Sequence, residues 1–261
     1  MSVRIAWERR GSGPPLVLVH GLGYARWGWE PVVDGLAERF SVVLFDNRGI
    51  GESDAPRSPY TVAEMAADTL GVLDEAGLEQ THVLGTSLGG MVAQELTLTA
   101  PERVERLVLA CTTPGGPAAY PMPEATVQLM VEAPSLEPAT ALRRFVENAL
   151  ARATVVERPE LVERILAHRL AAPQNPAAWQ GQAAAGAAFD VDGRLGAIAC
   201  PTLVLHGTAD TVVDVRNAQL LGERIPHARV ELLPDTGHLF FWEQPERFVA
   251  SVTAFLTEDG A

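Results

Sequence analysis

Ser87 lies in a setting that is typical of a catalytic nucleophile. It is the centre of a Gly-Thr-Ser-Leu-Gly pentapeptide at 85–89, between a strand-like run at 82–84 and a helix-like run at 91–96. A sharp turn from strand to helix holds such a serine in a sparsely populated backbone conformation and leaves no room for side chains two positions away. Because a chain of this length contains the pattern by chance about one time in ten, the neighbouring chemistry has to support it.

A serine hydroxyl is a weak nucleophile near neutral pH, so it needs a histidine as base and an acid that orients the histidine. Asp210 follows the strand-like run 202–206, and His238 follows the strand-like run 229–233. Active-site residues of α/β sheets gather at the carboxyl ends of the strands. We therefore predict Ser87, Asp210 and His238 as the catalytic residues. Asp214 is the alternative acid.

The sequence favours a reaction without a metal or a cofactor. No pair of cysteines or histidines has the spacing of zinc ligands, and there is no His-Glu-x-x-His motif. The chain contains no lysine, which excludes lysine Schiff bases, pyridoxal-phosphate chemistry and the phosphate-binding P-loop. Cys111 ends one predicted strand and Cys200 precedes the next, so parallel pairing of those strands would keep the sulfurs too far apart for a disulfide. Both are expected to be small buried residues.

The elements that must position these residues follow an α/β pattern. Strand and helix signals alternate through the first 112 residues, and several strands are continuous apolar runs, as expected for strands buried on both faces. Thr61 and Glu64 form a capping box at the start of one helix. The order predicts a mostly parallel, doubly wound sheet. The expected strands of this part are 3–8, 16–19, 41–46, 82–84 and 106–111.

The middle of the chain has a different character and predicts a helical insertion. No strand signal occurs between 113 and 197, and alternation then resumes with the strands at 202–206 and 229–233 and a final helix after Pro245. We therefore predict one core domain formed by 1–112 and 198–261, with 113–197 as a helical cap or lid. The helices expected in the cap are 124–131, 138–153, 158–171 and 176–188.

Size and charge limit the partners. A chain of 261 residues can bury a sizeable core without disulfides. A net charge of −13 and scattered arginines disfavour nucleic acid and anionic membranes, and no apolar stretch approaches the ~20 residues of a membrane span. The first residues show no secretory signal, so we expect a soluble, cytoplasmic protein that acts on a small molecule. The oligomeric state stays open, a homodimer included.

Several short segments form a common set of motifs, namely His20-Gly21, 45–53, the serine pentapeptide, 101–104, His206-Gly207 with Asp210, and Gly237-His238. Together they resemble the α/β-hydrolase superfamily over nearly the whole chain except the cap. Within that superfamily, residues 89–94 and the length of the cap are most similar to the group containing 3-oxoadipate enol-lactonases, small carboxylesterases and polyketide methylesterases.

This resemblance implies both a mechanism and further site residues. The order serine, acid, histidine along the chain is that of the superfamily. Its fold supplies two backbone amides as an oxyanion hole, which are those of Leu22 and Leu88 here. The expected reaction is hydrolysis of a carboxylic ester or lactone of small to medium size through an acyl-enzyme on Ser87. Trp27 and Leu239 are expected near the mouth of an apolar pocket.

Other activities on the same residues stay open. The serine at 87 excludes the dehalogenase and epoxide-hydrolase branches, which use an aspartate there. Carbon–carbon bond hydrolases usually have an aromatic residue directly after the base, where Leu239 stands, which disfavours them. Thioesterase, perhydrolase and a non-catalytic ligand receptor remain alternatives. Arg48 is expected to bond loop carbonyls, while Arg26 either meets a substrate carboxylate or faces solvent.

Overall fold

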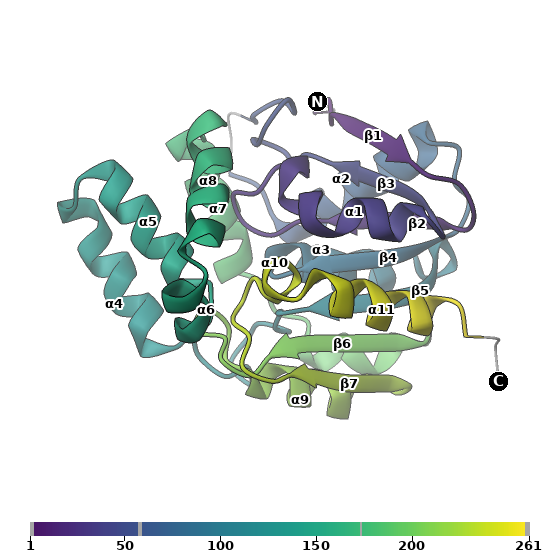
Figure 1. Cartoon of the computed structure of the whole chain (residues 1–261). Helices are drawn as coiled ribbons and strands as arrows, with labels where there is room; N and C mark the ends of the chain where they lie inside the picture. The colour runs from purple at the N-terminus through teal and green to yellow at the C-terminus, as the bar shows by residue number, and fades with distance from the viewer. Residues whose placement is uncertain (1–2, 57–58, 173, 259–261) are drawn as a thin grey trace.

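A single seven-stranded sheet forms the centre of the molecule (Figure 1). The computed structural model describes residues 3–56, 59–172 and 174–258. The strands follow the order β1-β3-β2-β4-β5-β6-β7, and every neighbouring pair is parallel except β1 with β3. The prediction of a mostly parallel α/β sheet is confirmed. The strands are β1 (Trp7–Arg10), β2 (Pro15–Val19), β3 (Ser41–Phe45), β4 (Thr81–Thr86), β5 (Val104–Ala110), β6 (Thr202–Gly207) and β7 (Ala228–Leu233).

Helices cover both faces of this sheet because successive strand residues point to opposite sides. In β2, Leu16 and Leu18 pack into a core with α1 (Glu30–Ala37) and α11 (Pro245–Leu256). Val17 and Val19 of the same strand pack into a second core on the other face. The helices of that second face are α2 (Val62–Glu75), α3 (Leu88–Thr99) and α9 (Arg216–Arg224), and short helices η1 (Arg26–Trp29), η2 (Pro101–Arg103) and α10 (Phe240–Glu243) complete the core domain.

Five helices between β5 and β6 gather at one end of the sheet (Figure 1). Two short stretches pair at the base of this insertion, where the Gly116 amide donates to the Phe189 carbonyl at 3.1 Å and the Val191 amide donates to the Pro114 carbonyl at 3.0 Å. We call residues 114–116 and 189–191 the neck and the helices beyond it the cap. The cap helices are α4 (Glu124–Glu132), α5 (Pro138–Asn148), α6 (Arg152–Glu157), α7 (Pro159–Ala171) and α8 (Pro176–Ala187), with η3 (Ala133–Ser135) between α4 and α5 and η4 (Asp192–Ala197) after the neck.

Local sequence signals place most helix starts correctly, and one predicted helix is wrong. The capping box at the start of α2 is present, with the Thr61 side chain and the Glu64 side chain each bonded to the other residue's amide. The helix expected over 138–153 is instead interrupted between α5 and α6. There the Ala149 carbonyl accepts the Leu239 amide at 2.9 Å, so a contact with the loop after β7 replaces the helix's own bond.

The two cysteines flank neighbouring parallel strands and form no disulfide. Cys111 follows β5 and is buried, whereas Cys200 precedes β6 and is half-buried. Burial raises the pKa of the Cys200 thiol to about 11, so this thiol stays protonated at neutral pH. Across the described ranges, no helix has both the length and the apolar character needed to cross a bilayer.

Candidate active site

Ser87 occupies a strained turn between β4 and α3. Its backbone angles are φ 53° and ψ −120°, in a region that residues with a side chain rarely adopt. Hydrogen bonds fix the backbone on both sides of the Ser87 Cα atom. The Ser87 amide donates to the Ala110 carbonyl at 2.9 Å, and the Thr112 hydroxyl donates to the Ser87 carbonyl at 2.7 Å. Strain of this kind costs about 1–3 kcal/mol and persists where the surroundings fix it. The side chain of Ser87 is half-buried.

The glycines around Ser87 are required by close backbone contacts. A side chain at Gly85 would collide with the carbonyl of Gly89, and one at Gly89 would collide with the carbonyl of Val19 at the end of β2. A methyl group at Gly21 would lie 3.0 Å from Cβ of Ser87 and 3.6 Å from its Oγ. The loop after β2 is therefore pressed directly against the serine turn.

We predict that Gly89→Ala loses most of the hydrolytic activity and is destabilised by about 1–3 kcal/mol, because the new methyl group forces β2 and α3 apart. Gly71→Ala is the matched control, since Gly71 lies inside α2 and the added carbon would have no atom within 4 Å apart from its chain neighbours and the nearby backbone of its own helix. That variant should be up to about 1 kcal/mol more stable than the wild type. Thermal unfolding and ester hydrolysis measure both, and equal behaviour of the two variants would contradict the packing argument.

Asp210 and His238 form a direct buried pair. The loops after β6 and β7 bring them together, with His238 Nδ1 2.8 Å from Asp210 Oδ2. The other carboxylate oxygen, Oδ1, accepts the amides of Val212 and Val213 at 2.7 and 2.9 Å. Because a carboxylate only accepts, Nδ1 of His238 carries the hydrogen, which leaves Nε2 available to take a proton.

The electrostatics of the pair favour an ionised acid and a basic imidazole. Burial by itself raises the pKa of the Asp210 carboxyl, but the charge and hydrogen bonds of the histidines beside it outweigh burial and hold the pKa well below its usual range. Burial by itself lowers the pKa of His238, and the negative charge of Asp210 outweighs it, so this pKa is raised above the ordinary histidine value.

His206 is a second neighbour of the acid that the sequence did not reveal as such. It is the penultimate residue of β6, four residues before Asp210, and is fully buried. Its Nε2 lies 3.1 Å from Asp210 Oδ2 and 3.1 Å from the carbonyl oxygen of Val213. In the sequence, His206 is marked only as part of the matching segment that contains Asp210. The alternative acid Asp214 is instead bonded to Arg216, with Oδ1 2.9 Å from the guanidinium Nε.

The end of β5 joins the serine turn to the histidine loop. The Ala110 carbonyl accepts the Ser87 amide, and the next residue, Cys111, is among the neighbours that raise the pKa of His238. Cys111 itself has a positive φ of 43°. The structure thus brings Asp210 and His238 into direct contact after β6 and β7, and it places Ser87 after β4, at the same edge of the parallel sheet.

Leu22, predicted as an oxyanion donor, lies in a tight turn after β2. The Tyr24 amide donates to the Gly21 carbonyl at 3.3 Å, and Gly23 has φ 72°, as a type II turn requires at its third residue. Within the described residues, the amides of Leu22 and Leu88 donate to no other protein group. We call 20–24 the oxyanion loop, after the function expected of it.

His20 anchors the oxyanion loop at its start. Its Nδ1 accepts the Gly21 amide at 2.7 Å, and the Asn47 side chain donates to the His20 carbonyl at 2.9 Å. Burial lowers the pKa of His20 to about 3. The ring is therefore neutral at physiological pH, as an accepting Nδ1 requires.

Trp27 and Leu239, the predicted pocket residues, have different surroundings. The half-buried Trp27 ring stacks on His168 of α7, with ring centroids 5.0 Å apart, whereas Leu239 is buried in the core. One cavity of about 340 Å³ lies between α5 and α7 and one of about 360 Å³ lies between α1 and α11, and neither is lined by Trp27, Leu239 or the predicted catalytic residues. That Trp27 and Leu239 line a substrate pocket stays a prediction.

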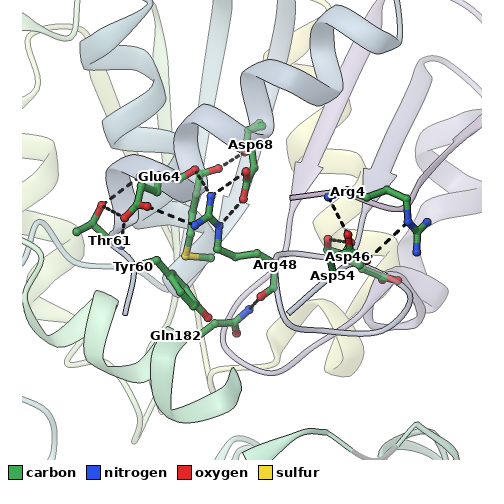
Figure 2. A network of polar contacts seen from close by, with 12 residues as sticks. Arg4, Asp46, Arg48, Asp54, Tyr60, Thr61, Glu64, Asp68 and Gln182 are labelled. Atoms are coloured by element: carbon green, nitrogen blue, oxygen red, sulfur yellow. Dashed lines mark hydrogen bonds and ion pairs between the residues drawn. The ribbon is translucent and has the colours of Figure 1, made fainter. Parts of the chain in front are cut away.

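Arg26 and Arg48 are both held in ion pairs. Arg48 donates to both carboxylate oxygens of Asp68, at 2.5 and 2.9 Å, and to the Glu64 carbonyl at 3.1 Å (Figure 2). Arg26 pairs with Asp46 at 3.3 Å and also with Glu8 and Glu52. These contacts give both arginines a structural function in the core domain. Across the described ranges, no group of three or more His, Cys, Asp or Glu residues is arranged to hold a metal ion.

A parallel sheet in this order, with a serine turn after β4 and acid and histidine loops after β6 and β7, is the arrangement of an α/β hydrolase. Residues 14–245 match the model of the alpha/beta hydrolase fold family, so the chain belongs to that family.

Similar proteins include esterases and lactonases. The pimeloyl-[acyl-carrier protein] methyl ester esterase of Aeromonas hydrophila subsp. hydrophila is 32% identical over 98% of this chain and 100% of its own length. The 3-oxoadipate enol-lactonase 2 of Acinetobacter baylyi is 30% identical over 93% of this chain and 88% of its own. The solved structure of Est816, described as an N-acyl homoserine lactone degrading enzyme, has a TM-score of 0.84 and 31% identity, covering 97% of both chains.

Proposed function

We propose that the protein is a serine hydrolase that cleaves carboxylic ester or lactone bonds of small to medium substrates. The observation that carries this proposal is the buried hydrogen bond between His238 and Asp210 at the same sheet edge as the strained Ser87. The three similar proteins act, by their names, on a methyl ester, an enol-lactone and a homoserine lactone. These substrates share an acyl carbon bonded to oxygen.

The proposed reaction has two halves. In the first, Nε2 of His238 takes the hydroxyl proton of Ser87 while Oγ attacks the carbonyl carbon, and the oxyanion accepts hydrogen bonds from the Leu22 and Leu88 amides. Collapse of this intermediate breaks the carbon–oxygen bond, and His238 gives its proton to the leaving alkoxide. In the second half, His238 deprotonates a water molecule that attacks the acyl carbon; the bond to Oγ then breaks, His238 returns the proton to Ser87, and the acid is released.

Asp210 contributes by orienting the imidazole and stabilising its charged form. The carboxylate does not take the proton itself, which agrees with its lowered pKa. The raised pKa of His238 makes its neutral form a stronger base, while burial beneath the loops keeps water from competing for its hydrogen bonds.

Labelling of the nucleophile tests the proposal directly. A fluorophosphonate should add one phosphonyl group to the protein, and peptide mass spectrometry should locate it on Ser87. A p-nitrophenyl ester should give a burst of phenol equal to the enzyme concentration when deacylation is slow. Absence of both the label and the burst would indicate a non-catalytic receptor and would contradict the proposal.

A substrate panel then defines the bond that is cleaved. It should contain short and medium acyl esters, 3-oxoadipate enol-lactone, N-acyl homoserine lactones, a thioester and a carbon–carbon bond substrate. We expect the oxygen esters and lactones to have the highest kcat/KM. A preference for the thioester or the carbon–carbon bond by more than about tenfold, or about 1.4 kcal/mol in the barrier, would overturn the assigned bond class while leaving the nucleophile intact.

A further inference from the structure

Gln182 is a fully buried cap residue that uses both ends of its amide to contact the core domain. Its Oε1 accepts the amide of Gly23 at 3.0 Å. Its Nε2 donates to the carbonyl of Arg48 at 3.1 Å, and Figure 2 shows this second bond. Gln182 lies in α8, more than 130 residues from either partner along the chain. One side chain therefore joins the cap to the oxyanion loop and to the loop after β3.

Arg169, a second cap residue, binds the backbone carbonyl of Gly23. This residue of α7 donates from Nη1 to the Gly23 carbonyl at 3.0 Å, and its guanidinium lies 4.9 Å from the ring centroid of Tyr24. Tyr24 in turn stacks on His20, with ring centroids 4.8 Å apart and planes 7° apart. Both backbone polar groups of Gly23 are thus bonded to cap side chains.

Close packing shows that the oxyanion loop is seated against the cap. A side chain at Gly23 would lie 2.6 Å from Oε1 of Gln174 and 2.9 Å from Cδ1 of Trp179, both cap residues. The positive φ of Gly23 also disfavours any other residue there. A methyl group at Gly23 would therefore force the side chains of Gln174 and Trp179 to shift.

We infer that Gln182 is a positioning residue, through which the docked cap fixes the orientation of the oxyanion loop. Gly23 follows Leu22 directly, so the bond from its amide to Gln182 fixes the peptide plane next to the Leu22 amide. An oxyanion donor works only when it is aimed at the place where the oxyanion forms, about 2.7–3.1 Å away. This inference rests on the proposed function, because it assigns Leu22 to the oxyanion hole.

The inference has a mechanistic consequence. If the cap lifts, the Gly23 amide and carbonyl lose both partners and the turn becomes free to rotate. Catalysis is then confined to the state in which the cap is docked, and cap movement and turnover are coupled through residues that do not touch the substrate. Other cap–core contacts, such as the ion pair of Arg164 with Glu30 at 2.7 Å, do not involve the oxyanion loop.

The test compares Gln182→Met with Gln180→Met, an exposed position on the same helix. Methionine keeps the unbranched shape but neither hydrogen bond. We expect kcat of Gln182→Met to fall about 10- to 100-fold with KM changed less than about threefold, since one oxyanion donor is worth about 100- to 1,000-fold when lost entirely. Affinity for a boronate or trifluoromethyl ketone inhibitor should fall in parallel. Gln180→Met should match the wild type.

A second pair of variants tests the inference if Gln182→Met does not fold. Arg169→Met removes the bond to the Gly23 carbonyl, and Arg164→Met on the same helix removes a cap–core ion pair away from the loop. We expect a fall in kcat for Arg169→Met only. If both members of either pair behave alike, or if only KM changes, the positioning function is wrong.

Hydrogen–deuterium exchange separates this inference from the proposed function. The hydrogen-bonded amides of Gly21, Gly23 and Tyr24 should exchange at least about tenfold faster in Gln182→Met than in Gln180→Met, whether or not the protein hydrolyses esters. Unchanged exchange overturns the inference even if activity falls. If exchange rises but wild-type hydrolysis does not depend on Ser87, the cap does hold the loop and the proposed function fails instead.

Discussion

Replacement of Ser87 by alanine should reduce the hydrolysis of an activated ester by at least about 10⁴-fold, because the acyl-enzyme can no longer form. The strained turn is held by backbone bonds to Ala110 and Thr112 that do not involve the Ser87 hydroxyl, so we expect the fold to be retained. Fluorophosphonate labelling should disappear at the same time. Steady-state kinetics, intact mass and circular dichroism together measure these results.

Ser135→Ala is the matched control for this prediction. Ser135 is exposed in η3 of the cap and bonds only to the nearby Glu132 carbonyl. The variant should label and turn over like the wild type. Retention of more than about one per cent of the activity in Ser87→Ala would show that another group is the nucleophile, because losses of that size are typical of secondary contributions.

The second large effect concerns pH and the acid. His238 must be neutral to take the serine proton, and its pKa is raised, so wild-type activity should be lost as the pH falls through a value above the ordinary histidine pKa of about 6.5. Burial lowers the pKa of His238, and in Asp210→Asn the largest influence that opposes burial, the charge of Asp210, is absent. The acid limb of the kcat/KM profile should therefore move to lower pH, while the maximal rate falls about 10⁴-fold.

Asp214→Asn serves as the control for the acid. Asp214 is paired with Arg216 and makes no hydrogen bond to His238. The variant should keep the wild-type rate and the wild-type acid limb. A shift of the acid limb in Asp214→Asn that equals the shift in Asp210→Asn would mean that the titration reports general surface charge rather than the buried pair.

Sequence patterns spanning only a few residues were enough to predict the parallel sheet and the three candidate catalytic residues. The spacing of glycines around Ser87 is imposed by backbone contacts inside one turn, and it can be read from five consecutive residues. Asp210 and His238 were predicted because carboxyl ends of parallel strands meet at one sheet edge. Predicting these two residues required only the positions of the preceding strands, and no knowledge of side-chain geometry.

Contacts between distant segments could not be predicted in this way. The break between α5 and α6 is set by a bond from the Leu239 amide to Ala149, ninety residues earlier. Gln182 has no local signature, because a buried glutamine in an alanine-rich helix is identified only by its partners in the core. The substrate pocket depends on several cap helices at once, so the parts of Trp27 and Leu239 remain untested.

The paired neck has a consequence for how such enzymes diversify. Because 114–116 and 189–191 lie side by side, the whole cap enters and leaves the core at one place, and a foreign cap could be grafted there as a cassette. The grafted unit would still have to supply an acceptor oxygen to the Gly23 amide, as Oε1 of Gln182 does. Chimeras that preserve this one bond should acquire new substrate selectivity without a fall in kcat. Retention of the bond is therefore a simple design criterion for recombination experiments.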